Sequence, residues 1–260
     1  MPPIYIMAVI TLAVSAAMWG GLIYACSGRD KRYLWLLLPG LPLSAVVNLL
    51  VKRPLIVWVG EAASIAPGQG LATPLWFIIF LWLVPPITEE AIKLAPLLLP
   101  WARQRLHSRT GALWTGMALG VGFGLGEAMF LAYGVAQSAH YAAYPWYAFT
   151  GYFGERFIVC FCHGVMTAVA VHGLHCGTWR ALTGYLAAVG LHAFLNAGAV
   201  LAQLGVISVT VASLSLLAPV IVLFLIFESL RRRAARAQDD AAIAAEVVYF
   251  RRHSDEDATP

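Results

Sequence analysis

Residues 74–100 read PLWFIIFLWLVPPITEEAIKLAPLLLP. This run is almost wholly apolar and long enough for a helix to cross a bilayer, which takes about 20 apolar residues. It nevertheless contains Glu89 and Glu90 side by side, with Lys93 close behind them. An ionised carboxylate at the centre of a membrane helix costs about 2.5–3.5 kcal/mol on insertion scales. The adjacent pair therefore indicates a wet cavity, a held proton or a cationic partner, and it marks a candidate functional site.

The whole chain has a membrane composition. Of its 260 residues, 60% are hydrophobic and 12% are charged, whereas a soluble domain carries about 25% charge. We predict an all-α, polytopic transmembrane helix bundle of about seven spans, near 4–26, 33–51, 74–100, 111–136, 156–176, 180–203 and 206–230. Proline removes a helix hydrogen bond, so a break at Pro85-Pro86 would give eight spans. Such a break at membrane depth must be buried in protein or line water, which would suit a site.

Basic residues predict the orientation of these spans. Cytoplasmic loops carry an excess of Lys and Arg, and most basic residues fall in alternate loops, with Lys52, Arg53 and Arg156 on the other side. We predict an N-terminus outside, a C-terminus in the cytoplasm, one integral-membrane domain over 1–230 and a cytoplasmic tail over 231–260. The location predicted is a bacterial-type inner (plasma) membrane. The first apolar run has no basic residues before it, so we expect an uncleaved anchor. The net charge of +4 does not indicate nucleic acid, because the basic residues lie at span ends.

The fourth predicted span is rich in glycine. Residues 116–130 read GMALGVGFGLGEAMF. The glycines at 116, 120 and 124, and again those at 122 and 126, are four residues apart, a spacing that lets a neighbouring helix approach closely. A phosphate-binding loop is excluded because no strand precedes this apolar run. We expect Glu127 to lie close to whichever helix packs on the glycine face.

Six polar residues on four predicted spans fall in one central layer of the membrane, at 1.5 Å of rise per residue: Glu89, Glu90, Glu127, His163, His192 and Asn196. A single membrane histidine is more often a satisfied interhelical hydrogen bond than a catalyst. Lys93 is also at helical distance from both Glu89 and Glu90, so one of the two carboxylates simply neutralises it. Arg156 shares a face with His163. Six such groups converging by chance is much less common than one, so we predict a shared site.

Peptide hydrolysis needs these residue types. It requires an activated water, a proton for the leaving amine and donors to the oxyanion. One of Glu89 and Glu90 would take the proton from water, His163 or Glu127 would hold the water or shuttle the proton, and His192 with Asn196 would donate to the oxyanion. Zinc is the alternative, because carboxylates and imidazoles are zinc ligands. In that case the ligands would come from Glu89, Glu90, Glu127, His163 and His192.

Four motifs occur in order on successive predicted spans: EEAIK at 89–93, FGLGE at 123–127, His163, and HAFLN at 192–196. Together they resemble the PrsW family of intramembrane proteases, part of the wider group that includes the CAAX prenyl endopeptidases and bacterial abortive-infection-like proteins. The resemblance covers roughly residues 74–200. Glu127 in place of the histidine of the CAAX branch, and Lys93 close behind the acidic pair, favour the PrsW side.

This resemblance implies a glutamate-activated water supported by the histidines and the asparagine, with Lys93, Phe123 and Arg156 in supporting positions. It implies a membrane-protein substrate, for example an anti-sigma factor or a prenyl- or lipid-linked protein, met among membrane lipids. Partly on this ground we favour a mechanism without a metal cofactor over a zinc-dependent one. Two alternative functions remain. One is a non-catalytic membrane scaffold or binding protein with the same pocket, and the other is a proton-coupled transporter, although no inverted repeat is visible.

Overall fold

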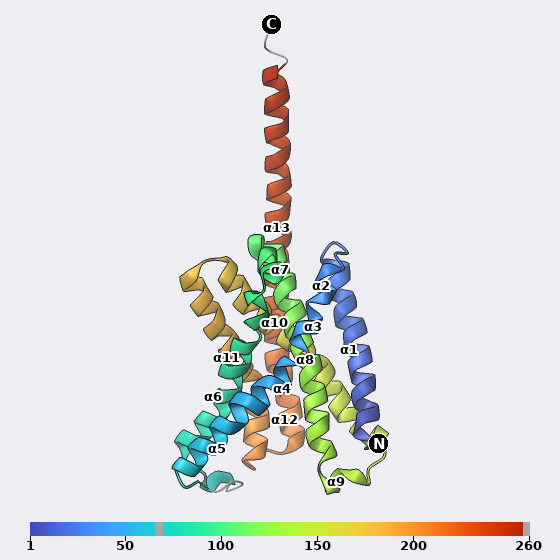
Figure 1. The fold of residues 1–260 in the computed structure, drawn as a ribbon, viewed down its shortest axis with the longest axis vertical. Helices are drawn as coiled ribbons and strands as arrows, with labels where there is room; N and C mark the ends of the chain where they lie inside the picture. The colour runs from blue at the N-terminus through green and yellow to red at the C-terminus, as the bar shows by residue number, and fades with distance from the viewer. Residues whose placement is uncertain (66–69, 257–260) are drawn as a thin grey trace.

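The computed structural model describes the backbone of residues 1–65 and 70–256, and the side chains of that part up to residue 240. Every regular element in these residues is helical, and seven of the helical segments are long and apolar enough to cross a membrane. The prediction of an all-α polytopic bundle is confirmed. The two ends of the described part of the chain lie at opposite ends of the molecule (Figure 1), as an odd number of spans requires.

The spans follow the chain in order. The long helices are α1 (Ile4–Cys26), α6 (Leu75–Ile92), α8 (Arg109–Ala136), α10 (Thr150–His175), α11 (Thr178–Gln203) and α13 (Leu217–Glu256). The second span is built from short pieces: α2 (Arg32–Trp35), α3 (Leu37–Gly40), α4 (Leu43–Val47), the π-helical η1 (Asn48–Lys52) and α5 (Arg53–Ala62). The connections hold η2 (Gly70–Ala72), η3 (Ala95–Leu98), α7 (Pro100–Arg103), η4 (Gln104–His107), α9 (Ala139–Ala142), η5 (Trp146–Phe149) and α12 (Val209–Ser215).

The glycine face of α8 packs against α10 with almost no space between the two backbones. A Cβ atom built on Gly116 would lie 2.4 Å from the Cα of Ala168, and one built on Gly120 would lie 2.2 Å from the carbonyl oxygen of His163. These distances are far shorter than a van der Waals contact, so only glycine permits the approach. The predicted role of the glycine spacing is confirmed, and it brings the backbone of His163 directly onto α8.

The opposite face of α8 receives the second span in the same way. A Cβ atom on Gly122 would lie 2.2 Å from the carbonyl oxygen of Leu37, and one on Gly126 would lie 1.9 Å from that of Leu41. Gly40 approaches α8 from the other side, where its Cβ would lie 2.7 Å from the carbonyl oxygen of Leu119. Other helices therefore pack closely against two faces of α8, and most of its length is buried.

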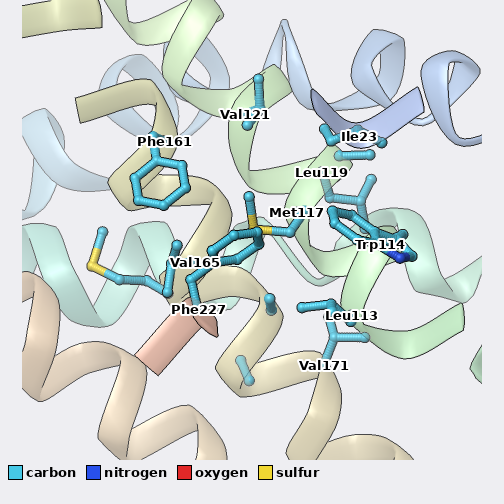
Figure 2. Close-up of a cluster of buried hydrophobic side chains, with 14 of the residues drawn as sticks. Ile23, Leu113, Trp114, Met117, Leu119, Val121, Phe161, Val165, Val171 and Phe227 are labelled. Carbon is cyan, nitrogen blue, oxygen red and sulfur yellow. The ribbon is translucent and has the colours of Figure 1, made fainter. Parts of the chain in front are cut away.

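A cluster of buried hydrophobic side chains joins α8 to α1, α10, α11 and α13 (Figure 2). Trp114 on α8 and Phe161 on α10 both pack edge-on against Phe227 of α13, with ring centroids 6.1 and 5.4 Å apart. α13 thus belongs to the bundle over its first turns. It runs as one helix to Glu256, across the predicted boundary at residue 230, and rises beyond the other helices in Figure 1. The division into domain and cytoplasmic tail stays a prediction.

Two expectations about span ends are wrong. α6 continues through Pro85 and Pro86 without a break, and the α-helix ends at Ile92, so the irregular backbone comes after the acidic pair instead of before it. The second span does not end at residue 51, because α5 extends it to Ala62. Lys52 consequently lies within the span, where we had expected an outer loop.

Candidate active site

The acidic pair on α6 is buried, and its two carboxylates have different partners. Glu89 and Glu90 are each 1% exposed. The Nζ atom of Lys93 donates to Oε1 of Glu90 at 2.6 Å, and that of Lys52 donates to Oε1 of Glu89 at 2.6 Å. The question of which carboxylate neutralises Lys93 is thus answered in favour of Glu90, three residues away. The second oxygen of each carboxylate is buried without a hydrogen-bond partner among the described residues.

Lys52 is the site residue that the sequence reading missed. It ends the π-helical segment η1, and π-helical turns are frequent at functional sites. Its side chain is 17% exposed. A signal was available: apolar residues continue after it, from Leu55 to Val59, so the two basic residues at 52 and 53 interrupt a hydrophobic segment and do not end one.

His192 on α11 links the acidic pair to the rest of the site. Its Nδ1 atom lies 2.7 Å from Oε1 of Glu90. Because a carboxylate only accepts, Nδ1 carries the hydrogen and donates. In the neutral imidazole, Nε2 then presents a lone pair, and it lies 3.8 Å from the unpartnered Oε2 of Glu89. Two buried acceptor atoms therefore face each other with no donor between them.

A second branch of the network runs from Lys93 through His163 on α10. The ammonium of Lys93 lies 2.7 Å from Nδ1 of His163 and can only donate, so Nδ1 accepts. Nε2 therefore carries a hydrogen and donates to Oε2 of Glu127 at 3.0 Å. Arg156 donates to the same oxygen of Glu127 at 3.0 Å. Arg156 thus pairs with Glu127 and is also bonded to Glu155, its neighbour in the chain.

The ring of Phe123 contacts two members of this branch, Lys93 and His163. Its ring lies 4.6 Å from the Nζ atom of Lys93, measured to the ring centroid, and packs edge-on against His163 with centroids 5.2 Å apart. The imidazoles of His163 and His192 are also neighbours, with centroids 5.1 Å apart and an interplanar angle of 78°. The predicted supporting residues Lys93, Phe123 and Arg156 therefore all lie within this one constellation.

A cavity of about 270 Å³ borders the network. Its polar lining comes from Glu127, Glu155, Arg156, His163, His192, Asn196 and Ser213, and its apolar lining comes from α10, α11 and α12. The lining does not include Glu89 or Glu90, which lie behind His192. Asn196 faces the cavity one helical turn from His192 and makes no side-chain hydrogen bond within the described residues. Of the six predicted site residues, four line this cavity and the acidic pair lies in the wall behind it.

Each of the three glutamates of the network has a cationic partner. Glu89, Glu90 and Glu127 are matched by Lys52, Lys93 and Arg156, each within 3.0 Å of its partner. Breaking a buried pair by removing one partner typically costs 3–5 kcal/mol, because the other charge stays buried and uncompensated. Glu155 is a fourth carboxylate, which lines the cavity and shares Arg156 with Glu127, so with both imidazoles neutral the cluster carries one net negative charge.

We tested whether these residues fit a metal ion. Ligand atoms of Glu89, His163 and His192 lie within 4.8 Å of one another, and two imidazoles with a carboxylate are a zinc-type donor set. Oε2 of Glu89 and Nε2 of His192 are free, but both nitrogens of His163 are already bonded, one of them to the ammonium of Lys93. A divalent ion bound by all three residues would displace one of the partners of His163. In the arrangement seen here the third ligand is not available.

A search of family models matches residues 8–227 to the one described as "PrsW family intramembrane metalloprotease". The match covers most of the chain and all six predicted site residues. No curated protein and no solved structure matches the chain.

Proposed function

The chain belongs to the PrsW family of intramembrane metalloproteases, and from this premise we propose that it is an endopeptidase whose attacking water is activated by Glu89. The substrate class is a membrane-anchored protein, with a single span or a lipid anchor, because the cavity lies among membrane-spanning helices. The observation that carries this proposal is the pair of buried acceptors, Oε2 of Glu89 and Nε2 of His192, 3.8 Å apart without a donor.

One water molecule satisfies both acceptors. It donates one hydrogen to Glu89 and the other to His192, and its oxygen lone pairs then point away from both. His192 lines the cavity and Glu89 does not, so the proposal requires a substrate in the cavity to approach this water past the imidazole of His192. A water held in this way is oriented as a nucleophile, and the carboxylate that takes its proton is already within hydrogen-bond reach, as general-base catalysis requires.

The reaction balances with Glu89 as the proton carrier and residues of the cavity as donors to the oxyanion. The water oxygen bonds to the carbonyl carbon of the peptide while its proton passes to Glu89. The negative charge that develops on the carbonyl oxygen is stabilised by N–H donors, for which Asn196 and Arg156 are the candidates because both line the cavity. The carbon–nitrogen bond then breaks, and Glu89 returns the proton to the leaving nitrogen. His192 acts on the water in this scheme, instead of donating to the oxyanion as first expected.

The remaining members position these groups. Glu90 accepts from Nδ1 of His192 and so leaves Nε2 of that ring as an acceptor. Lys93 neutralises Glu90 and fixes the ring of His163, which in turn holds Glu127. The division of labour proposed for the acidic pair is therefore Glu89 as base and Glu90 as the group that orients His192.

The test is cleavage by the purified protein in detergent or nanodiscs, with a library of membrane-spanning peptides. We expect Glu89→Gln to reduce kcat at least 100-fold, within the range of general-base contributions. Glu61→Gln is the matched control, because Glu61 is an exposed glutamate on α5 outside the site, and it should retain full activity. Cleavage that survives Glu89→Gln would show that another group is the base. A folded wild type that cleaves nothing in the library would favour a scaffold or binding protein.

Zinc dependence is the competing mechanism and has its own measurement. We expect activity to persist after dialysis against a strong chelator, with less than one equivalent of zinc found by elemental analysis. Loss of activity on chelation and its return on addition of zinc would overturn the metal-free mechanism while leaving the protease assignment intact.

A further inference from the structure

A second polar cavity, of about 360 Å³, lies at the end of the bundle where α13 emerges. It is an open hollow between the loop that joins the first two spans and the connection between α6 and α8. Its lining includes Asp30, Arg32, Tyr33, Trp101, Arg105 and Ser108. Its size is within the range of small-molecule sites, roughly 300–1,000 Å³. None of its residues belongs to the candidate active site.

Arg105 is the unusual member of this cavity. A guanidinium has five N–H donors, yet within the described residues Arg105 makes a single hydrogen bond, from NH1 to Oδ2 of Asp30 at 3.4 Å. Its Nε atom is buried without a partner, and its side chain is only 17% exposed. The guanidinium lies over the ring of Tyr33, 5.2 Å from the centroid, which holds it in place. A largely buried arginine with most of its donors unused is short of an acceptor.

Asp30 supplies Arg105 with one long hydrogen bond only, at 3.4 Å. Both of its carboxylate oxygens accept from Nε of Arg32, at 2.9 and 3.1 Å, and one also accepts from the backbone N–H of Arg32. The Arg32 hydrogen bond also holds the pKa of Asp30 below its usual value. The cavity therefore holds two arginines and one aspartate, and that aspartate is bonded mainly to Arg32. The cavity has an excess of positive charge. Ser108 adds a hydroxyl hydrogen, because its oxygen accepts from the N–H of Gly111 and its own hydrogen stays free.

The cavity lies at the level of lipid headgroups. Both loops that form it connect membrane spans, and α2 and α7 occupy the same end of the bundle in Figure 1. Trp101, which lines the cavity, is 42% exposed, and Trp35, two residues after Tyr33 in the chain, is 65% exposed. Exposed tryptophans are typical of the membrane–water interface. Basic pockets between spans at this level are a known way for proteins to bind anionic headgroups.

We propose that this cavity binds the phosphate group of an anionic phospholipid headgroup, with Arg105 as the principal donor. Arginine matches phosphate because its planar fork donates two parallel hydrogen bonds. The lipid is favoured over a free phosphate ion because the cavity opens among exposed interfacial tryptophans. A bound headgroup would join the second span to the start of α8, so binding should stabilise the fold. The proposal does not depend on protease activity.

The experiment compares thermal unfolding in nanodiscs of phosphatidylcholine alone, of phosphatidylcholine with phosphatidylglycerol, and of phosphatidylcholine with added inorganic phosphate. Native mass spectrometry counts the lipids retained. We expect phosphatidylglycerol to raise the unfolding temperature and to be retained, and we expect Arg105→Gln to weaken its binding roughly tenfold or more, as loss of a charged hydrogen bond predicts. Arg105→Lys should recover only part of the binding, because lysine lacks the fork.

Arg103→Gln is the matched control. It removes the same charge two residues away, from an exposed side chain that does not line the cavity. Equal losses in Arg103→Gln and Arg105→Gln would mean general surface attraction and would overturn the site. An Arg105-dependent stabilisation by inorganic phosphate alone would overturn the lipid as the ligand. If Arg105→Gln does not fold, Arg105→Lys provides the test. Retention of phosphatidylglycerol by Arg105→Lys that is as strong as in the wild type would contradict the proposal.

Discussion

At the scale of single residues, the two members of the acidic pair are distinguished by their partners, and Lys52 decides that distinction. Lys52→Met leaves Glu89 buried without its counter-ion. We expect the free energy of unfolding to fall by up to about 3–5 kcal/mol, the range for breaking a buried pair, measured by equilibrium unfolding in mixed micelles. Lys31→Met, which removes an exposed lysine, should change the stability by less than about 0.5 kcal/mol.

The double variant Lys52→Met/Glu89→Gln separates charge from packing. If the loss comes from the uncompensated carboxylate, the double variant should be more stable than Lys52→Met alone, because replacing both partners of a buried pair is often nearly neutral. A double variant that is as unstable as the sum of the single variants would mean that the two side chains are energetically independent.

The sequence predicts the six polar site residues, but it does not predict their pairings. Helical spacing places both Glu89 and Glu90 within reach of Lys93, so only the rotation of α6 against its neighbours decides between them. The sequence analysis misses Lys52 because it ends the second span at residue 51, whereas the span continues to Ala62. Its partner lies 37 residues along the chain, and no local pattern connects the two.

At the scale of elements, the contact between α8 and α10 determines where His163 lies. A methyl group at position 120 would lie 2.2 Å from the carbonyl oxygen of His163. We expect Gly120→Ala to cost about 1–3 kcal/mol, as overpacking does, and to reduce cleavage by shifting His163 away from Glu127 and Lys93. The measurement is thermal unfolding together with peptide cleavage.

Gly134→Ala on the same helix is the control, because no atom lies within 4 Å of the position its Cβ would take. It should be neutral or slightly stabilising, since alanine has the higher helix propensity. Equal destabilisation by the two variants would indicate that glycine matters in α8 for a reason other than the close approach.

The local sequence predicts which segments are helical and which faces of α8 carry glycine, but it does not predict where the helices end. Spacing alone identifies which faces of α8 carry glycine, and the structure confirms that other helices pack on both. The Pro85-Pro86 pair looks like a break, yet α6 passes through it while packed against α11, with Nε1 of Trp82 donating to the carbonyl oxygen of Ala193 at 2.8 Å. Such tertiary contacts override a local helix breaker, and they are invisible in the sequence.

At the scale of the whole molecule, the two ends of the described part of the chain lie at opposite ends of the bundle, and the distribution of basic residues predicts the C-terminus in the cytoplasm. In sealed inverted membrane vesicles, we expect a tag at the C-terminus to be digested by added protease and a tag at the N-terminus to be protected. Protection of the C-terminal tag would show that the orientation is the reverse of the predicted one, with the Arg105 cavity on the outer face of the membrane.

The ion pairs of the site also bear on how the protein enters the membrane. Lys52 and Glu89 belong to the second and third spans, and Glu127 and Arg156 belong to the fourth and fifth. Each charge raises the free energy of inserting its own segment into the lipid. The opposite charges neutralise each other when the two consecutive segments insert as a pair. We therefore expect the ion pairs of the proposed hydrolytic centre also to lower the cost of inserting this chain as helical hairpins during its synthesis.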